Sequence, residues 1–354
     1  MNSIRTILYL LLSLGSFFLV SHAVKQLVPW PDDGDLRVKR DYFRAHKEEY
    51  NSLFFGSSKV FRAVVPDLIE KELARHDLPM HSFNFGCPSM YTFETDFFVK
   101  EILRLGPKHL EWVFLEWVNW NPNIQDEDLY TVRTVHWHST EETWLALDAV
   151  LHGDRRFFDK VGLAIDHVGH WIWKQVSYGR GIDTVSYMLD RLKDPGDAPY
   201  VGDTAYIPEM HGYHALEDEL HLPGITKRRS YFVANQDRYH DMIKNLRQRN
   251  RRTSAAAGIH LKSLARQVDA IRAVGAEPFF FDIPGELETP APIPYLKDEK
   301  IRALIGYNRL RVFPDFFDPK NRFDSNHFSR EGAECFTRAF ASDFAALIEK
   351  GGDS

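Results

Sequence analysis

The sequence predicts an α/β protein: a three-layer α/β/α sandwich with a central parallel sheet and a large helical insertion. Short apolar runs end in small or polar residues and are followed by helical stretches, and this order returns after a long interruption. A repeated order of strand, loop and helix is typical of a parallel sheet covered by helices on both faces. With 354 residues, of which 44% are hydrophobic and 14% aromatic, the chain can fill a core of that size.

The first half of the domain is predicted over residues 45–124. Three apolar runs read as its strands: residues 52–55 (SLFF), 83–85 (FNF) and 112–117 (WVFLEW). Between them we expect a helix from Pro66, a favoured first helical position, to about Arg75, and a second from Phe93 to Leu105. Gly106 and Pro107 stop the second helix.

The pattern breaks over residues 125–254, which we interpret as a helical insertion or cap. Its expected helices span residues 140–151, 155–176 and 230–249, and a loop rich in Gly, Pro and Asp spans 194–212. The second half of the domain, residues 255–354, restores the pattern. The spacing of Leu261, Leu264, Val268 and Ile271 predicts an amphipathic helix, residues 278–281 a strand, and Ser329 the cap of a last helix.

The N-terminal segment, residues 1–24, reads as a signal peptide or a membrane anchor. Residues 7–20 are apolar and follow Arg5, and Ser21-His22-Ala23 offers a small-x-small cleavage site. Stretched to Val24, the run is just long enough for an uncleaved span, and a buried core helix is the alternative. More positive charge follows the run than precedes it, which weighs against a cytoplasmic N-terminus. We expect an exported main domain behind a linker at 25–44, either anchored or secreted.

Composition and missing motifs exclude several classes. The net charge of −6 argues against a general nucleic-acid binder. The two cysteines, Cys87 and Cys335, are too few for a disulfide scaffold, and one bridge between them stays open. The sequence contains no GxxxxGK[ST], no HExxH and no GxGxxG after a strand.

Polar and small residues gather at the carboxyl ends of the predicted strands, where an open α/β sheet presents its binding crevice. Gly56-Ser57-Ser58 follows the first strand, Gly86 the second, and Asn119 and Asn121 the third. Asp324 and His327 precede the last helix. A serine needs a base to remove its proton, and a carboxylate fixes the tautomer of a histidine base, so this placement predicts acyl-transfer chemistry.

These blocks resemble those of the SGNH, or GDSL-like, hydrolase superfamily, in the same order, over residues 52–121 and 259–347. The resemblance implies that Ser58 is the nucleophile, His327 the general base and Asp324 its orienting carboxylate, with no cofactor. It implies that Gly86 and Asn119 are oxyanion donors. The usual third block reads Gly-x-Asn-Asp, whereas this chain has Trp117-Val118-Asn119-Trp120, so Asn121 is the substitute donor.

The form Gly-Ser-Ser behind an apolar N-terminal segment is similar to cell-envelope members of that superfamily, which act in D-alanylation of teichoic acids and O-acetylation of alginate and peptidoglycan. The similarity implies an extracytoplasmic or periplasmic esterase or O-acyltransferase. Its partners would be an acylated polysaccharide or other envelope polymer and a membrane-bound acyltransferase, without nucleic acid. The alternative is a non-catalytic envelope protein that binds glycan or partners such an acyltransferase.

Other interpretations stay open at single residues. Ser57 is a rival nucleophile, and Ser58 could instead cap the turn before a helix. His136 and His138, on one face of an expected strand near Glu141 and Glu142, have spacing that zinc could use. So do His211, His214 and Glu217. Hydrogen-bonded or surface histidines are the default, and we expect no metal. The basic runs 227–229 and 247–252 are expected to be solvated, with an anionic lipid or acidic glycan as the functional alternative. Trp144, Trp171 and Trp173 are expected in the core of the insertion.

Overall fold

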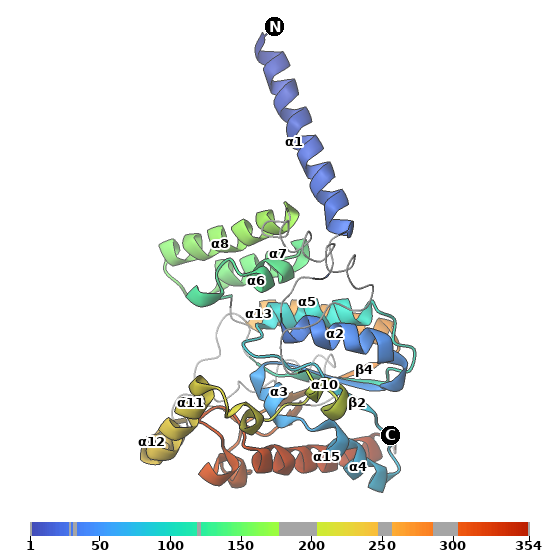
Figure 1. Ribbon diagram of the computed structural model, residues 1–354, viewed down its shortest axis with the longest axis vertical. Coiled ribbons are helices and arrows are strands. Elements are labelled where there is room, and N and C mark those ends of the chain that lie inside the picture. Colours follow the sequence, from blue (N-terminus) through green and yellow to red (C-terminus); the bar gives the residue numbers. More distant parts are fainter. Residues whose placement is uncertain are drawn as a thin grey trace. The chain divides into compact units, whose positions relative to one another are not determined.

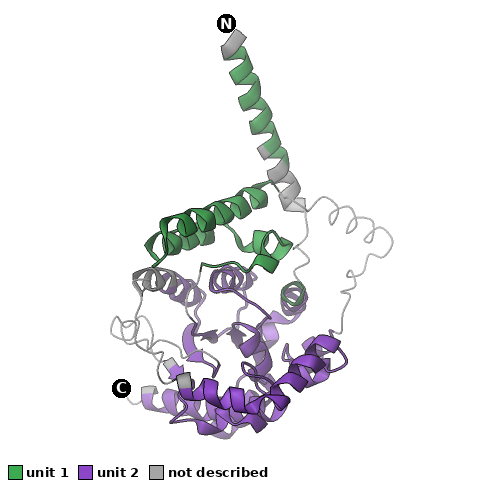
Figure 2. Ribbon diagram, turned by 90° about the vertical axis from the view of Figure 1, so that its left-hand side faces the viewer, with its two compact units in different colours: residues 1–37, 122–202 green, residues 38–121, 203–354 purple. Residues whose placement is uncertain are grey.

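The computed structural model describes residues 2–27, 30, 34–118, 122–176, 204–246, 257–285 and 304–352 (Figure 1). The chain forms two compact units, coloured separately in Figure 2. Unit 1 combines Met1–Arg37 with Pro122–Gly202, and unit 2 combines Val38–Asn121 with Asp203–Ser354. The expected insertion at 125–254 therefore divides between the units, because the helices after residue 203 pack with the sheet domain.

Unit 2 is built on a five-stranded, wholly parallel sheet with strand order β2-β1-β3-β4-β5. The strands are β1 (Ser52–Phe55), β2 (Ser82–Asn84), β3 (Trp112–Glu116), β4 (Glu277–Asp282) and β5 (Leu304–Gly306). The first four coincide closely with the predicted runs, whereas β5 was not predicted, since three residues give too short an apolar run. Almost every strand residue whose side chain is described is buried, as expected for a sheet covered on both faces.

Helices cover both faces of the sheet, which confirms the predicted three-layer α/β/α architecture (Figure 1). One layer holds α2 (Asp35–His46), α5 (Thr92–Leu103) and α13 (Ala257–Ala273). The other holds α3 (Ser58–Ala63), α4 (Pro66–Leu73) and α15 (Arg330–Gly352). The core between sheet and second layer is aromatic: Phe114 of β3 lies within stacking distance of Phe54, Phe340 and Phe344.

The segment predicted as a linker at 25–44 instead contains most of α2. Leu36, Lys39 and Phe43 are buried at helical spacing, and the ammonium of Lys39 donates to the carbonyls of Asn84 and Gly86. The Pro and Asp content before α2 hid this buried stripe in the sequence. Lys39 also interrupts the apolar pattern of α2, because a lysine counts as polar in the sequence although its buried stem packs like an apolar side chain.

The remaining helices of unit 2 follow residue 203. They are α10 (Tyr206–Met210), α11 (Pro223–Ala234) and α12 (Gln236–Leu246). The single helix expected over 230–249 is thus two helices, which meet at Asn235. The buried Phe232 and Tyr239, one from each helix, pack edge to face at 5.1 Å and belong to the main core.

Unit 1 contains α1 (Asn2–Leu27), α6 (Val132–Trp137), α7 (Thr140–His152) and α8 (Phe157–Gln175). Residues 136–138, expected as part of a strand, are at the end of α6, where the side chain of Thr131 accepts a hydrogen bond from the N–H of Thr134 and caps the helix. Among the described residues, no helix is long and apolar enough to span a bilayer.

Candidate active site

The turn after β1 presents Ser58. A Cβ on Gly56 would lie 2.3 Å from a methyl group of Val60 and 2.6 Å from Cβ of Glu116, so the close approach of β3 to this turn requires glycine. The Ser57 hydroxyl accepts from the N–H of Lys59 at 3.2 Å and caps α3. The capping role that the sequence left open therefore belongs to Ser57, and Ser58 is the first residue of α3.

A tight turn holds Asp324 and His327 at the other end of the chain. The Asp324 carboxylate accepts the backbone N–H groups of Asn326 and His327 at 2.7 and 2.8 Å. After the turn, the Ser329 hydroxyl accepts the N–H of Gly332 at 3.2 Å, as expected for the cap of α15. The aspartate thus fixes the backbone of the turn and orients the histidine with the same carboxylate.

The two segments meet in a hydrogen-bonded chain. Nε2 of His327 lies 2.8 Å from Oγ of Ser58, and Nδ1 lies 3.0 and 3.1 Å from the two carboxylate oxygens of Asp324. Because a carboxylate only accepts, Nδ1 carries the proton and Nε2 accepts from the serine hydroxyl. The structure therefore brings together the three residues that the sequence singled out for nucleophilic chemistry.

Burial and nearby charges set the protonation states of His327 and Asp324. Burial lowers the pKa of His327, and although Asp324 opposes the shift, the positive charges of Arg228 and Arg322 add to it. Burial alone would raise the pKa of Asp324, but the hydrogen bond from His327 and the nearby charges hold it well below the usual range. At neutral pH the site therefore combines a neutral imidazole with a charged carboxylate, the state in which histidine accepts a proton.

Arginines of α11 contact the turn from Asp324 to His327. The guanidinium of Arg228 forms an ion pair with Asp324 and lies against His327 Nδ1, and Arg229 donates to the carbonyls of Arg322 and Phe323 at 2.7 and 2.8 Å. Since Nδ1 donates to Asp324, Arg228 donates to the carboxylate rather than to the ring. The basic run 227–229 is therefore no simple solvated face, while residues 247–252 lie outside the described residues.

Glu116, at the end of β3, holds the turn that contains Ser57 and Ser58. Its buried carboxylate accepts the N–H of Ser57 at 2.7 Å, and the ammonium of Lys59 lies 3.0 Å from its other oxygen. Sequence reasoning missed both residues. A lone carboxylate inside the apolar run WVFLEW was the available signal, since buried charges are paired.

The sequence predicted Gly86, Asn119 and the substitute Asn121 as oxyanion donors. The N–H of Gly86 donates to Oδ1 of Asn84 at 2.8 Å, and a Cβ on Gly86 would lie 2.3 Å from the backbone nitrogen of Phe61. Gly86 is therefore a close-packing glycine whose N–H is used within the protein, which weighs against its predicted role as an oxyanion donor. Asn119 and Asn121 lie outside the described residues.

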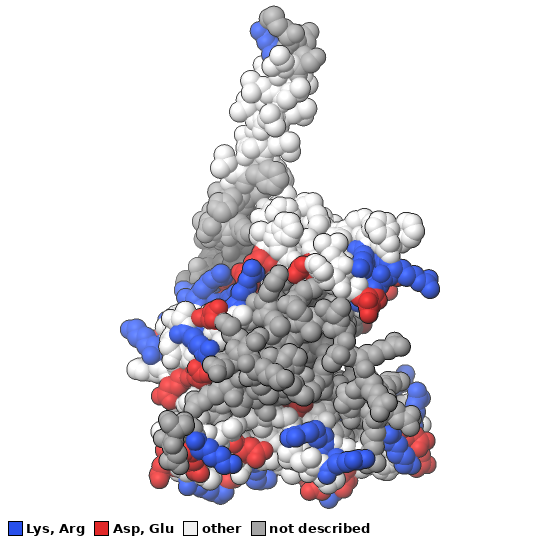
Figure 3. Space-filling model, turned by 180° about the vertical axis from the view of Figure 1, so that it is seen from behind, with Lys and Arg blue, Asp and Glu red and all other residues white. Residues whose placement is uncertain are grey.

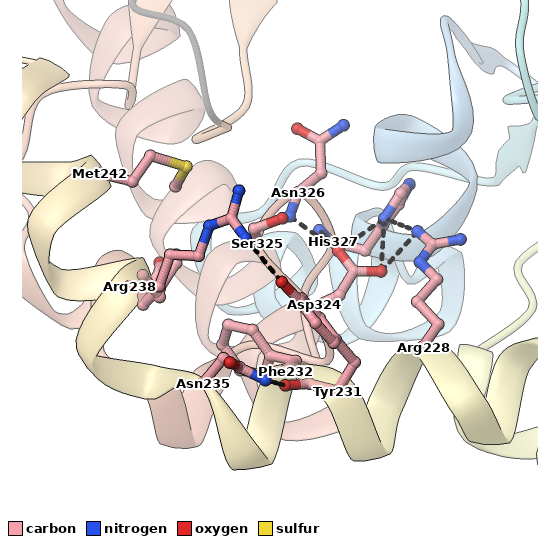
Figure 4. Close-up of a pocket in the computed structure, with 11 residues that line it drawn as sticks. Arg228, Tyr231, Phe232, Asn235, Arg238, Met242, Asp324, Ser325, Asn326 and His327 are labelled. Atoms are coloured by element: carbon pink, nitrogen blue, oxygen red, sulfur yellow. Dashed lines mark hydrogen bonds and ion pairs between the residues drawn. The ribbon is translucent and has the colours of Figure 1, made fainter.

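A cavity of about 540 Å³ adjoins the turn from Asp324 to His327 (Figure 4). The turn residues from Asp324 to His327 form one wall, and side chains of α11 and α12 form the other. Among these, Arg238 donates to the hydroxyl of Tyr231 at 2.8 Å. The cavity thus offers aromatic surface and two guanidinium groups, those of Arg228 and Arg238, beside the histidine.

The histidines considered as metal ligands have other roles. In unit 1, His138 and His167 are fully buried, with Nε2 of the first 2.9 Å from Nδ1 of the second. The hydroxyl of Tyr50 is hydrogen-bonded to Nδ1 of His211 at 2.9 Å. Nδ1 of His214 lies 3.3 Å from a carboxylate oxygen of Glu219. No group of three or more potential ligands is placed to hold a metal ion in the part of the chain that the structure describes. Cys87 and Cys335, whose pairing the sequence left open, form no disulfide with each other.

No family model and no curated protein matches this chain. The functional conclusion therefore rests on the site geometry and on the sequence resemblance.

Proposed function

We propose that the protein is a serine-dependent esterase or O-acyltransferase. The observation that carries this proposal is the hydrogen-bonded chain from Ser58 Oγ through His327 to Asp324, with distances of 2.8 and 3.0 Å. Three residues so placed are rare without a catalytic role, because a hydroxyl needs both a neighbouring base and an oriented tautomer to become nucleophilic.

The reaction follows from the chain of hydrogen bonds. Ser58 Oγ forms a bond to the ester carbonyl carbon while its proton moves to Nε2 of His327, and Asp324 stabilises the imidazolium. The tetrahedral intermediate then expels the alcohol, which takes the proton from Nε2 and leaves an acyl-serine. Water, or a sugar or polyol hydroxyl, adds to that ester as His327 again takes the proton. The second tetrahedral intermediate then breaks its bond to Ser58 Oγ, which recovers the proton from Nε2. Water gives hydrolysis, and the hydroxyl gives transfer.

The proposed substrates are acyl esters of cell-envelope glycans outside the cytoplasm. The resemblance to envelope members of the SGNH superfamily and the apolar N-terminal segment support this location. The cavity beside His327 supports a polar acceptor, because Arg228 and Arg238 suit anionic groups and Tyr231 offers an aromatic surface to a sugar ring. We further propose a membrane-bound acyltransferase as partner.

The second candidate is a non-catalytic envelope protein that binds glycan or partners an acyltransferase. The hydrogen bond from Gly86 to Asn84 favours it, because it removes one of the oxyanion donors that the resemblance implied. Loss of one such donor typically costs about 10²–10³ in rate, so a slower enzyme remains compatible with the geometry.

Labelling with a fluorophosphonate probe separates the two candidates. The enzyme proposal expects labelling of the wild-type protein and none of Ser58→Ala or His327→Ala. Ser57→Ala is the matched control, because Ser57 is adjacent but only caps α3, and it should still label. A folded wild-type protein that does not react would overturn the enzyme proposal and leave the binding role.

A further inference from the structure

Helix α8 exposes its apolar side. Six large apolar residues, which we call the α8 stripe, are 38–83% exposed: Phe157, Phe158, Val161, Ile165, Val168 and Ile172. At 3.6 residues per turn they fall within one arc of about 100° around the helix. No charged residue of α8 lies within that arc.

The opposite side of α8 is the one that packs inside unit 1. His167 and His170 are fully buried there, and His167 bonds to His138 at the end of α6. A surface helix ordinarily buries its apolar stripe and exposes its polar residues. In α8 this arrangement is inverted, so the stripe does not serve the core of unit 1.

Neighbouring residues extend the exposed apolar surface. Trp144 and Leu151 of α7, seven residues apart and so on one side of that helix, are 68% and 61% exposed. Trp144, expected in the core of the insertion, therefore lies at the surface. α7 packs against α8, and exposed apolar side chains gathered on two packed helices mark a surface that something covers.

Helix α1 indicates what covers it. α1 belongs to the same unit and contacts α8. Its large apolar side chains from Ile4 to Val20 are 52–73% exposed and point to all sides of the helix. On the face shown in Figure 3, the described part of α1 is white apart from basic atoms near its N-terminal end. A helix that is apolar on every side needs an apolar surrounding, and lipid supplies one whether or not the helix spans the bilayer.

Charge and residue type at the start of α8 agree with lipid. Arg155 and Arg156 directly precede Phe157 and Phe158, and Lys160 follows them in the first turn of α8, next to Asp159. Cations beside aromatic side chains are typical of helices that lie at the boundary between acyl chains and anionic headgroups. The stripe thus has the composition of an interfacial helix and lies in the unit that carries α1.

We propose that α8 docks on the surface of a phospholipid bilayer, with the α8 stripe buried among the acyl chains and α8 parallel to the membrane plane. This contact is separate from α1 and would hold unit 1 against the membrane. It does not depend on the proposed esterase activity.

Brominated lipid quenching tests this docking in the full-length protein bound to vesicles of phosphatidylcholine and phosphatidylglycerol. A fluorescent dye is attached at Ile165→Cys in the stripe or, as matched control, at Asp159→Cys, an exposed position on the other side of α8. Cys87 is buried and Cys335 is replaced by Ser. We expect blue-shifted, strongly quenched emission at 165 and unchanged emission at 159, with flotation showing equal vesicle binding.

Two outcomes would overturn the proposal. Equal, weak quenching at both positions on vesicle-bound protein would show that the stripe stays in water. A blue shift at 165 without vesicles, growing with protein concentration alongside a dimer in light scattering, would show that a second copy covers the stripe. Phe158→Glu with Ile165→Glu should abolish the lipid signal, read from a dye at Val161→Cys, whereas Gly162→Glu outside the stripe should not.

Discussion

Arg228 of α11 shares the carboxylate of Asp324 with His327. Asp324 is thus held from two directions, by the turn that contains it and by a helix from the segment that interrupts the sheet. Arg228 also places a permanent positive charge against the proposed general base, which makes protonation of His327 less favourable.

Arg228→Gln should move the acid limb of the pH profile of kcat/KM to higher pH. The reactive form needs neutral His327, and burial together with Arg228 lowers its pKa below the ordinary value of about 6.5. Without that charge the pKa rises, so activity is lost at a higher pH as the solution is acidified. Hydrolysis of a neutral aryl ester measures the limb. Arg238→Gln, in the same cavity, should leave it unchanged, and coincident limbs for wild type and Arg228→Gln would refute the assignment.

Asp324→Asn should lower kcat by roughly 10⁴, as expected when the histidine loses the acceptor that fixes its tautomer. The asparagine oxygen can still accept the N–H groups of Asn326 and His327, so the turn should keep its shape and the melting temperature should change little. Rates of aryl-ester hydrolysis and thermal melts of the same preparations check both parts. Nearly wild-type activity in a folded variant would contradict the triad.

Gly86→Ala should destabilise the fold, since its Cβ would meet the backbone of Phe61 at 2.3 Å. Overpacking of this kind costs about 1–3 kcal/mol in the free energy of unfolding, measured by urea denaturation. Gly224→Ala, in α11 with nothing within 4 Å of the added methyl, is the control and should change stability by no more than about 0.5 kcal/mol. A Gly86→Ala protein of normal stability but impaired catalysis would restore the oxyanion assignment.

The buried pair of His138 and His167 should make unit 1 less stable in acid. Burial lowers the pKa of His167 to about 4, whereas an unfolded histidine titrates near 6.5. Between these values the unfolded chain binds more protons, so stability is complete above about pH 7 and is lost as pH falls from about 6.5 toward 4. Hydrogen exchange of α8 at about pH 7.5 and pH 5 measures this loss.

His167→Gln should remove much of this pH dependence. His152→Gln should not, because the side chain of His152 is 63% exposed and contacts Asp148 within its own helix, α7. Equal protection of α8 at both pH values in the wild type would show that the pair does not titrate on unfolding.

The sequence predicted four strands and the triad because both depend on local patterns. SLFF, FNF, WVFLEW and PFFF are apolar runs that only a covered sheet buries, and parallel topology then places their carboxyl ends on one edge. Ser58 followed the first run directly. Asp324 and His327 were found because their spacing matched a base and its orienting acid.

The parts that escaped prediction depend on long-range contacts. Arg228 reaches Asp324 only because α11 folds back onto the catalytic turn, and no local pattern records that return. Gly86 read as an oxyanion donor because its partner, the side chain of Asn84, looked like an ordinary strand residue. The stripe of α2 was hidden since Lys39 counts as polar in any pattern, although it is fully buried.

The pairing of β3 with β4 has a consequence for biogenesis. Phe114 lies opposite Phe279, yet the whole segment with α6 to α12 separates them in the chain. Closing so large a loop is entropically costly and slow. While the chain emerges from its N-terminus, β3 is an open strand edge that other chains can join. In the proposed mechanism Ser58 needs His327, which is synthesised after the last strand of the sheet. The nascent protein is therefore expected to react with esters only after all five strands have been made.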